Sequence, residues 1–271
     1  MRSPSLVIAA ILCSCMAACE DPRGDCEKVQ EPARAIRACT VVINSGRESK
    51  HIVALALYNR GIAEINRGDF DNAIADLSSS ANLKPDNART YYNRALAYFS
   101  KGETDSAIAD LTKTLDLDPK YQLALVRRAT AKLKKDDYAG AVSDATQALS
   151  LDANDDLAYA TRAAAFYFSK DYERAVADFT EALRITPGDA KRYVARGWAY
   201  VRSLNIKLAA ADAEHAIKLG ASDARAYELR AHLHELVGQN DKAIAALRAA
   251  LRADPTREET RTALRRLGAT P

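Results

Sequence analysis

One spacing governs this sequence, because alanine recurs every 34 residues over most of its length. The members of this series are Ala73, Ala107, Ala141, Ala175, Ala209 and Ala243. Residues 59–85, 93–119 and 195–221 align around them without gaps. A fixed period of about 20 to 50 residues is the signature of a repeat architecture, in which each unit packs only on its neighbours. The sequence therefore predicts a stack of similar units.

Each period holds two stretches with the spacing of an amphipathic helix. In residues 88–121, Tyr91 and Tyr98 lie on one face of a first helix. A turn follows at Gly102, and Pro119 ends a second apolar stripe. Small residues at the alanine positions let the two helices approach closely, and the neighbouring unit must cover their apolar face. We therefore predict an all-α fold of helical hairpins.

At many positions at once, this pattern resembles the tetratricopeptide repeat family. The first helix keeps a small residue at Gly61, Ala95, Ala129, Ala163, Gly197 and Ala231. An aromatic residue follows at Tyr98, Phe166 and Tyr200, and prolines close the units at Pro85, Pro119, Pro187 and Pro255. The departures are Ala153 and Ala221 for the proline, and Glu64, Lys132 and His234 for the aromatic residue. The resemblance implies a right-handed α-solenoid of helix-turn-helix repeats.

Six repeats and two caps account for most of the chain. The repeats are predicted at residues 54–87, 88–121, 122–155, 156–189, 190–223 and 224–257. Residues 20–53 are expected to form an N-terminal capping hairpin, whose second helix lies in 32–46. Residues 258–271 are expected to form a C-terminal capping helix and a tail. Polar-faced end units of this kind keep a solenoid soluble.

The first nineteen residues have the layout of a secretory signal peptide, with Arg2 ahead of an uncharged apolar run that ends in small residues. Residues 16–19, MAAC, resemble a bacterial lipobox with methionine in place of the usual leucine. Cys19 is thus the lipidation candidate, and plain cleavage near residues 17–19 is the alternative. In both cases we expect an exported bacterial protein of the periplasm or cell envelope.

Beyond this segment the only cysteines are Cys26 and Cys39. In an oxidising compartment, two cysteines this close in sequence commonly form a disulfide. Such a bond would close the N-terminal capping hairpin. The alternative is two free, small apolar side chains.

The sequence holds no pattern typical of catalysis. Its histidines are His51, His215, His232 and His234, and the last two lie on different faces of a helix, unlike a zinc-binding pair. It has no phosphate-binding loop, dinucleotide fingerprint, nucleophile elbow or CxxC motif. A balance of 39 basic and 36 acidic residues indicates neither nucleic acid nor an anionic membrane as partner. We predict a non-enzyme with no catalytic, cofactor or metal site.

The resemblance instead implies a binding groove lined by the first helix of each repeat. The positions that it carries over to this chain are Tyr58, Asn59, Ile62, Arg89, Tyr92, Asn93, Leu96, Phe99, Arg127, Tyr167, Phe168, Lys191, Trp198 and Arg202. Aromatic residues mixed with cations are typical of a recognition surface. The expected partner is a protein or peptide segment. The alternative for any one aromatic residue is packing against a neighbouring first helix.

A second series places charge beside the apolar stripes. Arginine recurs every 34 residues at Arg60, Arg94, Arg128, Arg162, Arg196 and Arg230, where the family usually has leucine. Aspartate keeps step on the second helix at Asp76, Asp110, Asp144, Asp178 and Asp212. Arginine is rarely buried unless paired. The spacing allows pairs within a repeat and between repeats. We expect a structural ladder in which one guanidinium serves two carboxylates.

Two functions follow from these patterns. The first is a non-enzymatic scaffold of the cell envelope that binds a peptide or helix of a partner in the groove. The second is a lipid-anchored assembly lipoprotein that stacks on other envelope subunits. Membrane contact is expected only through an N-terminal lipid, and the oligomeric state stays open.

Overall fold

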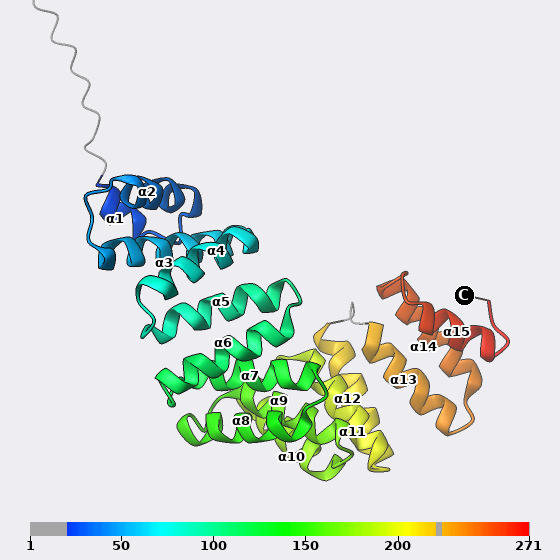
Figure 1. Ribbon diagram of the computed structural model, residues 1–271. Helices are drawn as coiled ribbons and strands as arrows, with labels where there is room; N and C mark the ends of the chain where they lie inside the picture. The colour runs from blue at the N-terminus through cyan, green and yellow to red at the C-terminus, as the bar shows by residue number, and fades with distance from the viewer. Residues whose placement is uncertain (1–20, 221–223, 271) are drawn as a thin grey trace, which may run out of the picture. The chain divides into compact units, whose positions relative to one another are not determined.

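The computed structural model describes residues 21–220 and 224–270, and every regular element within them is an α-helix (Figure 1). The predicted signal peptide and Cys19 lie outside the described residues. None of the described helices is both long enough and apolar enough to cross a membrane. The chain divides into two compact units between Asp86 and Asn87.

The first unit contains two helical hairpins. Its helices are α1 (Pro22–Cys26), α2 (Pro32–Asn44), α3 (Lys50–Arg67) and α4 (Phe70–Leu83). A disulfide joins Cys26 at the end of α1 to Cys39 in α2, as expected for the capping hairpin. Helix α3 begins before the predicted repeat boundary at residue 54. The cause is Ser49, whose side chain caps the helix by accepting a hydrogen bond from the backbone N–H of Ile52.

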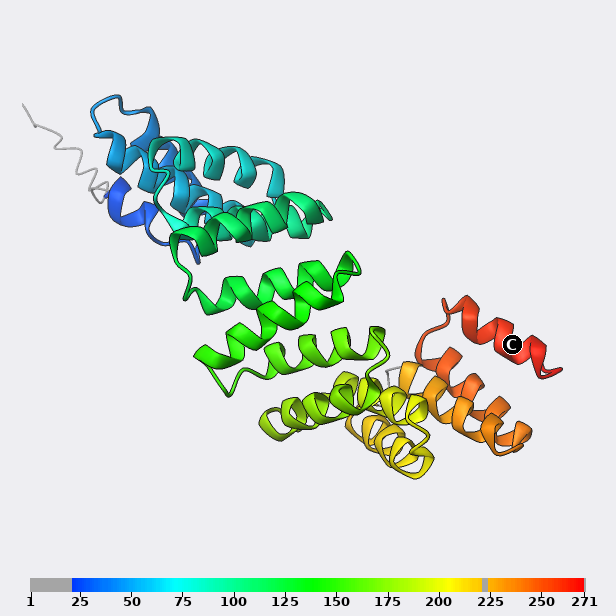
Figure 2. The same ribbon diagram turned by 60° about the horizontal axis from the view of Figure 1, so that its bottom comes forward.

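The second unit contains five hairpins and a terminal helix, and consecutive hairpins stack along the chain (Figure 1 and Figure 2). The hairpins are α5 (Ala88–Ser100) with α6 (Thr104–Leu117), α7 (Gln122–Lys134) with α8 (Tyr138–Leu151), α9 (Asp156–Phe168) with α10 (Tyr172–Ile185), α11 (Ala190–Arg202) with α12 (Ile206–Leu219), and α13 (Ala224–Leu236) with α14 (Asn240–Ala253). The terminal helix is α15 (Glu258–Arg266). In each hairpin the first helix is odd-numbered.

Small residues bring the two helices of each hairpin together. All six alanines of the 34-residue series are fully buried. In the first repeat, Gly61 on α3 lies against Ala73 and Leu77 of α4, and an added Cβ would lie 2.7 Å from Cγ of Leu77. A larger residue at either position would push the helices apart, because protein cores have few voids to absorb extra atoms.

The turn between the two helices of each of the six repeats has a left-handed backbone at one position. In three repeats this position is a glycine: Gly68, Gly102 and Gly238. In the other three it is Asp136, Lys170 and Leu204, with φ of 59°, 67° and 63°. Glycine adopts this conformation freely, whereas a residue with a Cβ is strained there.

The C-terminal helix α15 covers the last hairpin. Leu264 is fully buried against Ala246 and Leu247. Two arginines of this cap pair with α13, because Arg257 contacts Glu228 and Arg266 contacts Glu235.

Candidate protein-interaction site

The five Arg–Asp pairs lie within repeats. In each, the arginine of the first helix donates two hydrogen bonds to the aspartate of the second helix. The closest N–O distances are 2.5 Å for Arg60–Asp76, 2.7 Å for Arg94–Asp110, 2.8 Å for Arg128–Asp144, 2.7 Å for Arg162–Asp178 and 2.8 Å for Arg196–Asp212. This two-point geometry is the strongest form of an arginine–carboxylate contact. The pairs clamp the two helices of one hairpin together.

A third nitrogen of the guanidinium reaches the preceding repeat. Nη1 donates to a threonine hydroxyl on the preceding second helix at 3.1 Å, in the pairs Arg128–Thr112, Arg162–Thr146 and Arg196–Thr180. In the first unit Arg60 donates likewise to Thr40 of α2 at 2.8 Å. The expected bridge between two aspartates is therefore corrected, because a threonine takes the place of the second carboxylate.

Arg230, the last arginine of the 34-residue series, has no aspartate partner in its own repeat. Arg230 has Ala246 where an aspartate would stand in its own repeat. The preceding helix offers Glu214 in place of threonine, and its carboxylate lies 3.5 Å from Nη1 of Arg230. The guanidinium also lies 5.1 Å from the centre of the Tyr227 ring. The acidic partner of Arg230 therefore lies in the preceding repeat, whereas the other arginines pair with an aspartate of their own repeat.

Tyrosine rings flank several of the same arginines. Arg196 lies 5.4 Å from the ring centre of Tyr193 and 5.7 Å from that of Tyr200. Hydrogen bonds to Asp212 raise the pKa of Arg196 above its ordinary value. A guanidinium held between rings and a carboxylate is a structural cation. Arg196 is thus already occupied by contacts within the protein.

Two repeats replace the aromatic residue beside the pair with a charge. In the third repeat, Lys132 lies 2.9 Å from Asp144 as a second cation. In the first, Glu64 is 5% exposed, and its Oε2 has no hydrogen-bond partner among the described residues. Burial, followed by the charge of Asp76, raises the pKa of Glu64 to about 7. Glu64 is a buried carboxyl group that takes up a proton more readily than an exposed glutamate does.

The predicted groove residues divide by exposure. The exposed ones are Arg89, Arg127, Phe168, Lys191 and Arg202, and the partly exposed ones are Tyr58, Ile62, Asn93, Leu96, Phe99, Tyr167 and Trp198. Tyr92 and Asn59 are buried, at 8% and 9% exposed, which corrects their placement on a binding surface. Tyr92 stacks on Tyr121, with ring centres 5.0 Å apart, because Tyr121 at the start of α7 covers it. We use the name first-helix surface for those predicted groove residues of the second unit that are exposed or partly exposed.

An apolar pocket opens on the first-helix surface between α9 and α11. Its volume is about 170 Å³, and it is lined by Ala164, Tyr167, Phe168, Phe179, Ala195 and Trp198. Phe168 is 55% exposed, so a large apolar side chain already faces solvent at the pocket. The pocket gathers the predicted Tyr167, Phe168 and Trp198 in one place.

Three residues of this region were absent from the predicted groove. Phe179 on α10 lines the pocket, although its position in the repeat matches the core residues Leu77 and Leu111. Tyr138 and Tyr172 begin second helices, where Tyr138 stacks on Phe168 with ring centres 5.7 Å apart. A groove defined by first helices alone does not include Tyr138 and Tyr172. Their recurrence as aromatic first residues of two successive second helices was a sequence signal that could have identified them.

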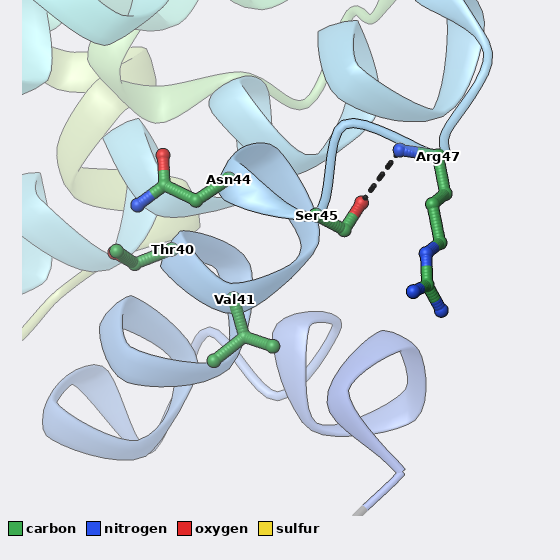
Figure 3. Close-up of a pocket in the computed structure, with 5 residues that line it drawn as sticks. All are labelled: Thr40, Val41, Asn44, Ser45 and Arg47. Carbon is green, nitrogen blue, oxygen red and sulfur yellow. Dashed lines mark hydrogen bonds between the residues drawn. The ribbon is translucent and has the colours of Figure 1, made fainter.

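A wider hollow lies at the end of α2 in the first unit (Figure 3). Its volume is about 510 Å³, and its lining is Thr40, Val41, Asn44, Ser45 and Arg47. The contact drawn between them is a hydrogen bond from the backbone N–H of Arg47 to the side-chain hydroxyl of Ser45 (Figure 3). The side chains converge on no common point, so size alone does not make this hollow a binding site.

In residues 21–220 and 224–270, no three histidine, cysteine, aspartate or glutamate side chains gather in a metal-binding arrangement. Stacked helical hairpins that expose aromatic rings and cations on one face define the class of helical-repeat interaction scaffolds. More specifically, the chain belongs to the tetratricopeptide repeat family. Tetratricopeptide repeat models match residues 61–102, 88–121, 126–190 and 194–258. Proteins of this family are generally non-catalytic scaffolds that bind other proteins.

Solved structures show the same fold at low identity. A tetratricopeptide repeat protein from Parabacteroides merdae is 21% identical with a TM-score of 0.69, over 91% of this chain and 96% of that one. A chain of the APC/C hetero-tetramer Cut9–Hcn1 is 18% identical with a TM-score of 0.68, over 88% of this chain and 48% of that one. PilF of Pseudomonas aeruginosa is 16% identical with a TM-score of 0.67, over 81% of this chain and 100% of that one. No curated protein matches the sequence significantly.

Proposed function

We propose that this protein is a scaffold of the cell envelope that binds a peptide or helix of a partner protein along the first-helix surface. The observation that carries the proposal is the apolar pocket between α9 and α11, with Phe168 half exposed at its edge and Trp198 in its wall. Large aromatic side chains at an open pocket are typical of the energetic centre of an interface.

Contacts among the side chains beside the pocket favour a binding surface that is already ordered in the free protein. Arg202 donates two hydrogen bonds of 3.2 Å to the hydroxyl of Tyr172, and Tyr167 packs edge-on against the same ring. These contacts hold the rim of the pocket in one arrangement before a partner arrives. Binding then orders fewer side chains, which lowers its entropic cost.

A pull-down from envelope extract tests the proposal. We expect the Phe168→Ala, Trp198→Ala double variant to lose partners that the unaltered protein retains. The matched control is Leu208→Ala, which removes a 50% exposed leucine from the second helix α12. A photoreactive amino acid at position 168 should crosslink to the same partners. Identical partners for the double variant and the unaltered protein contradict binding at this surface.

The envelope location rests on the layout of residues 1–19. Mass spectrometry of the mature N-terminus tests it and also separates the two forms of the proposal. An acylated Cys19 supports an anchored protein that assembles with other envelope subunits. An unmodified N-terminus near residues 18–20 supports a free scaffold. A chain that still begins at Met1 in its native host contradicts export.

A further inference from the structure

The first helices of the second unit are almost free of negative charge. Helices α5, α7, α9 and α11 contain one acidic residue, Asp156. Its carboxylate already accepts hydrogen bonds from Arg192 and Thr186, at 2.5 and 2.7 Å. The acids of α13 are also neutralised, because Glu228 and Glu235 pair with arginines of the C-terminal cap.

The cations of these helices fall into two groups. The first group pairs with aspartates and consists of the arginines of the 34-residue series in α5, α7, α9 and α11, together with Lys132 and Arg192. Arg89, Arg127 and Lys191 are exposed, and none of them makes an ion pair with another described residue. Lys134 lies 3.8 Å from the ring centre of Phe99, and Arg202 rests against Tyr172. The first-helix surface is therefore positive, whereas the whole chain is nearly neutral at +3.

A solvated helical face is the ordinary explanation of exposed charge, but such a face usually mixes both signs. Three second helices of this unit do so, because α6, α10 and α12 each carry acidic and basic residues, whereas α8 carries only the paired Asp144. The excess of positive charge on the first helices therefore needs a different explanation. Complementarity to a partner of opposite sign supplies it, because matched potentials steer and orient binding.

The cations and the pocket are aligned. Along α11, Lys191, Ala195, Trp198 and Arg202 are spaced by four, three and four residues, so they share one face of the helix. Two of them, Ala195 and Trp198, line the pocket. A positive charge therefore lies on each side of the apolar site.

The size of the pocket sets the size of the group that fills it. A cavity of roughly 150 Å³ lined by apolar side chains holds one benzene ring. The pocket measures about 170 Å³. It therefore accommodates one phenylalanine-sized or leucine-sized side chain.

From the charge and the pocket together we infer that the segment bound at the first-helix surface is acidic and inserts one large apolar side chain between α9 and α11, with its carboxylates toward Lys191 and Arg202. This inference rests on the proposed function and names the chemistry of the partner. It differs from capture of a terminal carboxylate, since the anchor is an internal apolar side chain.

Three fluorescein-labelled synthetic peptides test it by fluorescence anisotropy with the purified full chain. The first has a central phenylalanine flanked by glutamates. The second replaces the phenylalanine with alanine, and the third replaces the glutamates with lysines. We expect the first to bind at least about tenfold more tightly than either of the others. Its affinity should fall as salt is raised, because exposed charges are screened.

Protein variants then assign the two parts of the site. Ala164→Leu fills the pocket without leaving a cavity, so we expect it to weaken the phenylalanine peptide about tenfold and to leave the alanine peptide unchanged. Lys191→Glu should weaken the acidic peptides and strengthen the lysine peptide. The matched control is Lys207→Glu, an exposed lysine of α12 in the same repeat.

The outcomes separate this inference from the proposed function. Equal binding of the lysine and glutamate peptides, no binding by any of the three, or no effect of Ala164→Leu overturns the acidic, anchored segment. The proposed function survives each of these results if the Phe168, Trp198 double variant still loses its partners. Binding at the first-helix surface is contradicted if that variant keeps them.

Discussion

The first and third repeats solve the same packing problem with opposite charges. Both hold an arginine–aspartate pair between their helices, Arg60–Asp76 and Arg128–Asp144. Next to the pair, the third repeat has Lys132, which gives Asp144 a second cation. The first repeat has Glu64, which adds a second carboxyl group beside Asp76.

The fold therefore accepts either a cation or a carboxyl group at the position of Lys132 and Glu64, but the two differ in their cost in folding free energy. Two cations around one buried carboxylate both contact an opposite charge, and the excess positive charge lies on Lys132, whose side chain is partly exposed to water. Two carboxyl groups beside one arginine cannot both stay ionised cheaply, so one of them takes up a proton more readily. The first repeat is therefore expected to depend on pH where the third does not.

Removal of Asp144 is expected to have the largest effect. Asp144→Ala strands both Arg128 and Lys132 near a carboxylate site whose side chain is 5% exposed. Breaking a buried ion pair in this way costs about 3 to 5 kcal/mol of unfolding free energy. Denaturant melts measure it, with Asp116→Ala on the exposed face of α6 as control. A loss below about 1 kcal/mol contradicts a role in holding the hairpin together.

Neutralising Glu64 tests the pH dependence. Its folded pKa of about 7 lies above the ordinary 4.5, so the folded state binds this proton more tightly. The resulting stabilisation is full below about pH 4.5 and is lost as pH rises through 7. The loss amounts to roughly 3 kcal/mol, and Glu64→Gln should abolish it.

Unfolding free energies of Glu64→Gln and the unaltered protein, measured on both sides of this pH window, check the expectation. The two should diverge at alkaline pH. Glu27→Gln, an exposed glutamate of the same unit, serves as the control and should follow the unaltered protein. If Glu64→Gln has the same pH dependence as the unaltered protein, Glu64 does not titrate in this window.

Lys132→Glu would convert the third repeat into a copy of the first. It replaces the second cation of Asp144 with a second carboxyl group. We expect a loss of about 2 kcal/mol at neutral pH, smaller than a fully buried charge would give because the Lys132 side chain is 21% exposed. The loss should shrink on acidification as the new carboxyl group takes up a proton. Calorimetric melts at several pH values check this, and a pH-independent loss would count against the comparison.

The smallest effect concerns the turn between the helices, where the first repeat has Gly68 and the third has Asp136. Leu204 occupies the same position in the fifth repeat, with φ of 63°. Leu204→Gly should stabilise by about 1 kcal/mol by removing left-handed strain. Asp136→Gly should gain less, because a short polar side chain tolerates this conformation. Thermal melts that show no gain for Leu204→Gly would mean that the turn carries no strain.

Much of the fold was predictable because the 34-residue period fixes it many times over. The pairing of arginine with aspartate was less so. Each arginine lies 16 residues before one aspartate and 18 after another, so spacing alone does not choose. In the structure, Arg128 pairs with Asp144 of its own hairpin. Its contact with the preceding repeat is to Thr112, a residue type that gives no signal of this role in the sequence.

The surface was harder to predict for a physical reason. Whether a first-helix residue is exposed depends on residues outside its own helix. Tyr121, which precedes α7, stacks on Tyr92 and buries it, whereas Phe168 stays 55% exposed although Tyr138 stacks on one side of its ring. A pattern confined to one helix contains no information about that neighbour.

The direction of the arginine contacts bears on how the chain folds as it is made. Arg128 meets its aspartate 16 residues later, and its link to another repeat goes back to Thr112. Arg162 and Arg196 follow the same rule. Synthesis runs from the N-terminus, and early segments fold first. Each of these cations is therefore satisfied as soon as its own hairpin has left the ribosome, without waiting for any residue still to be translated.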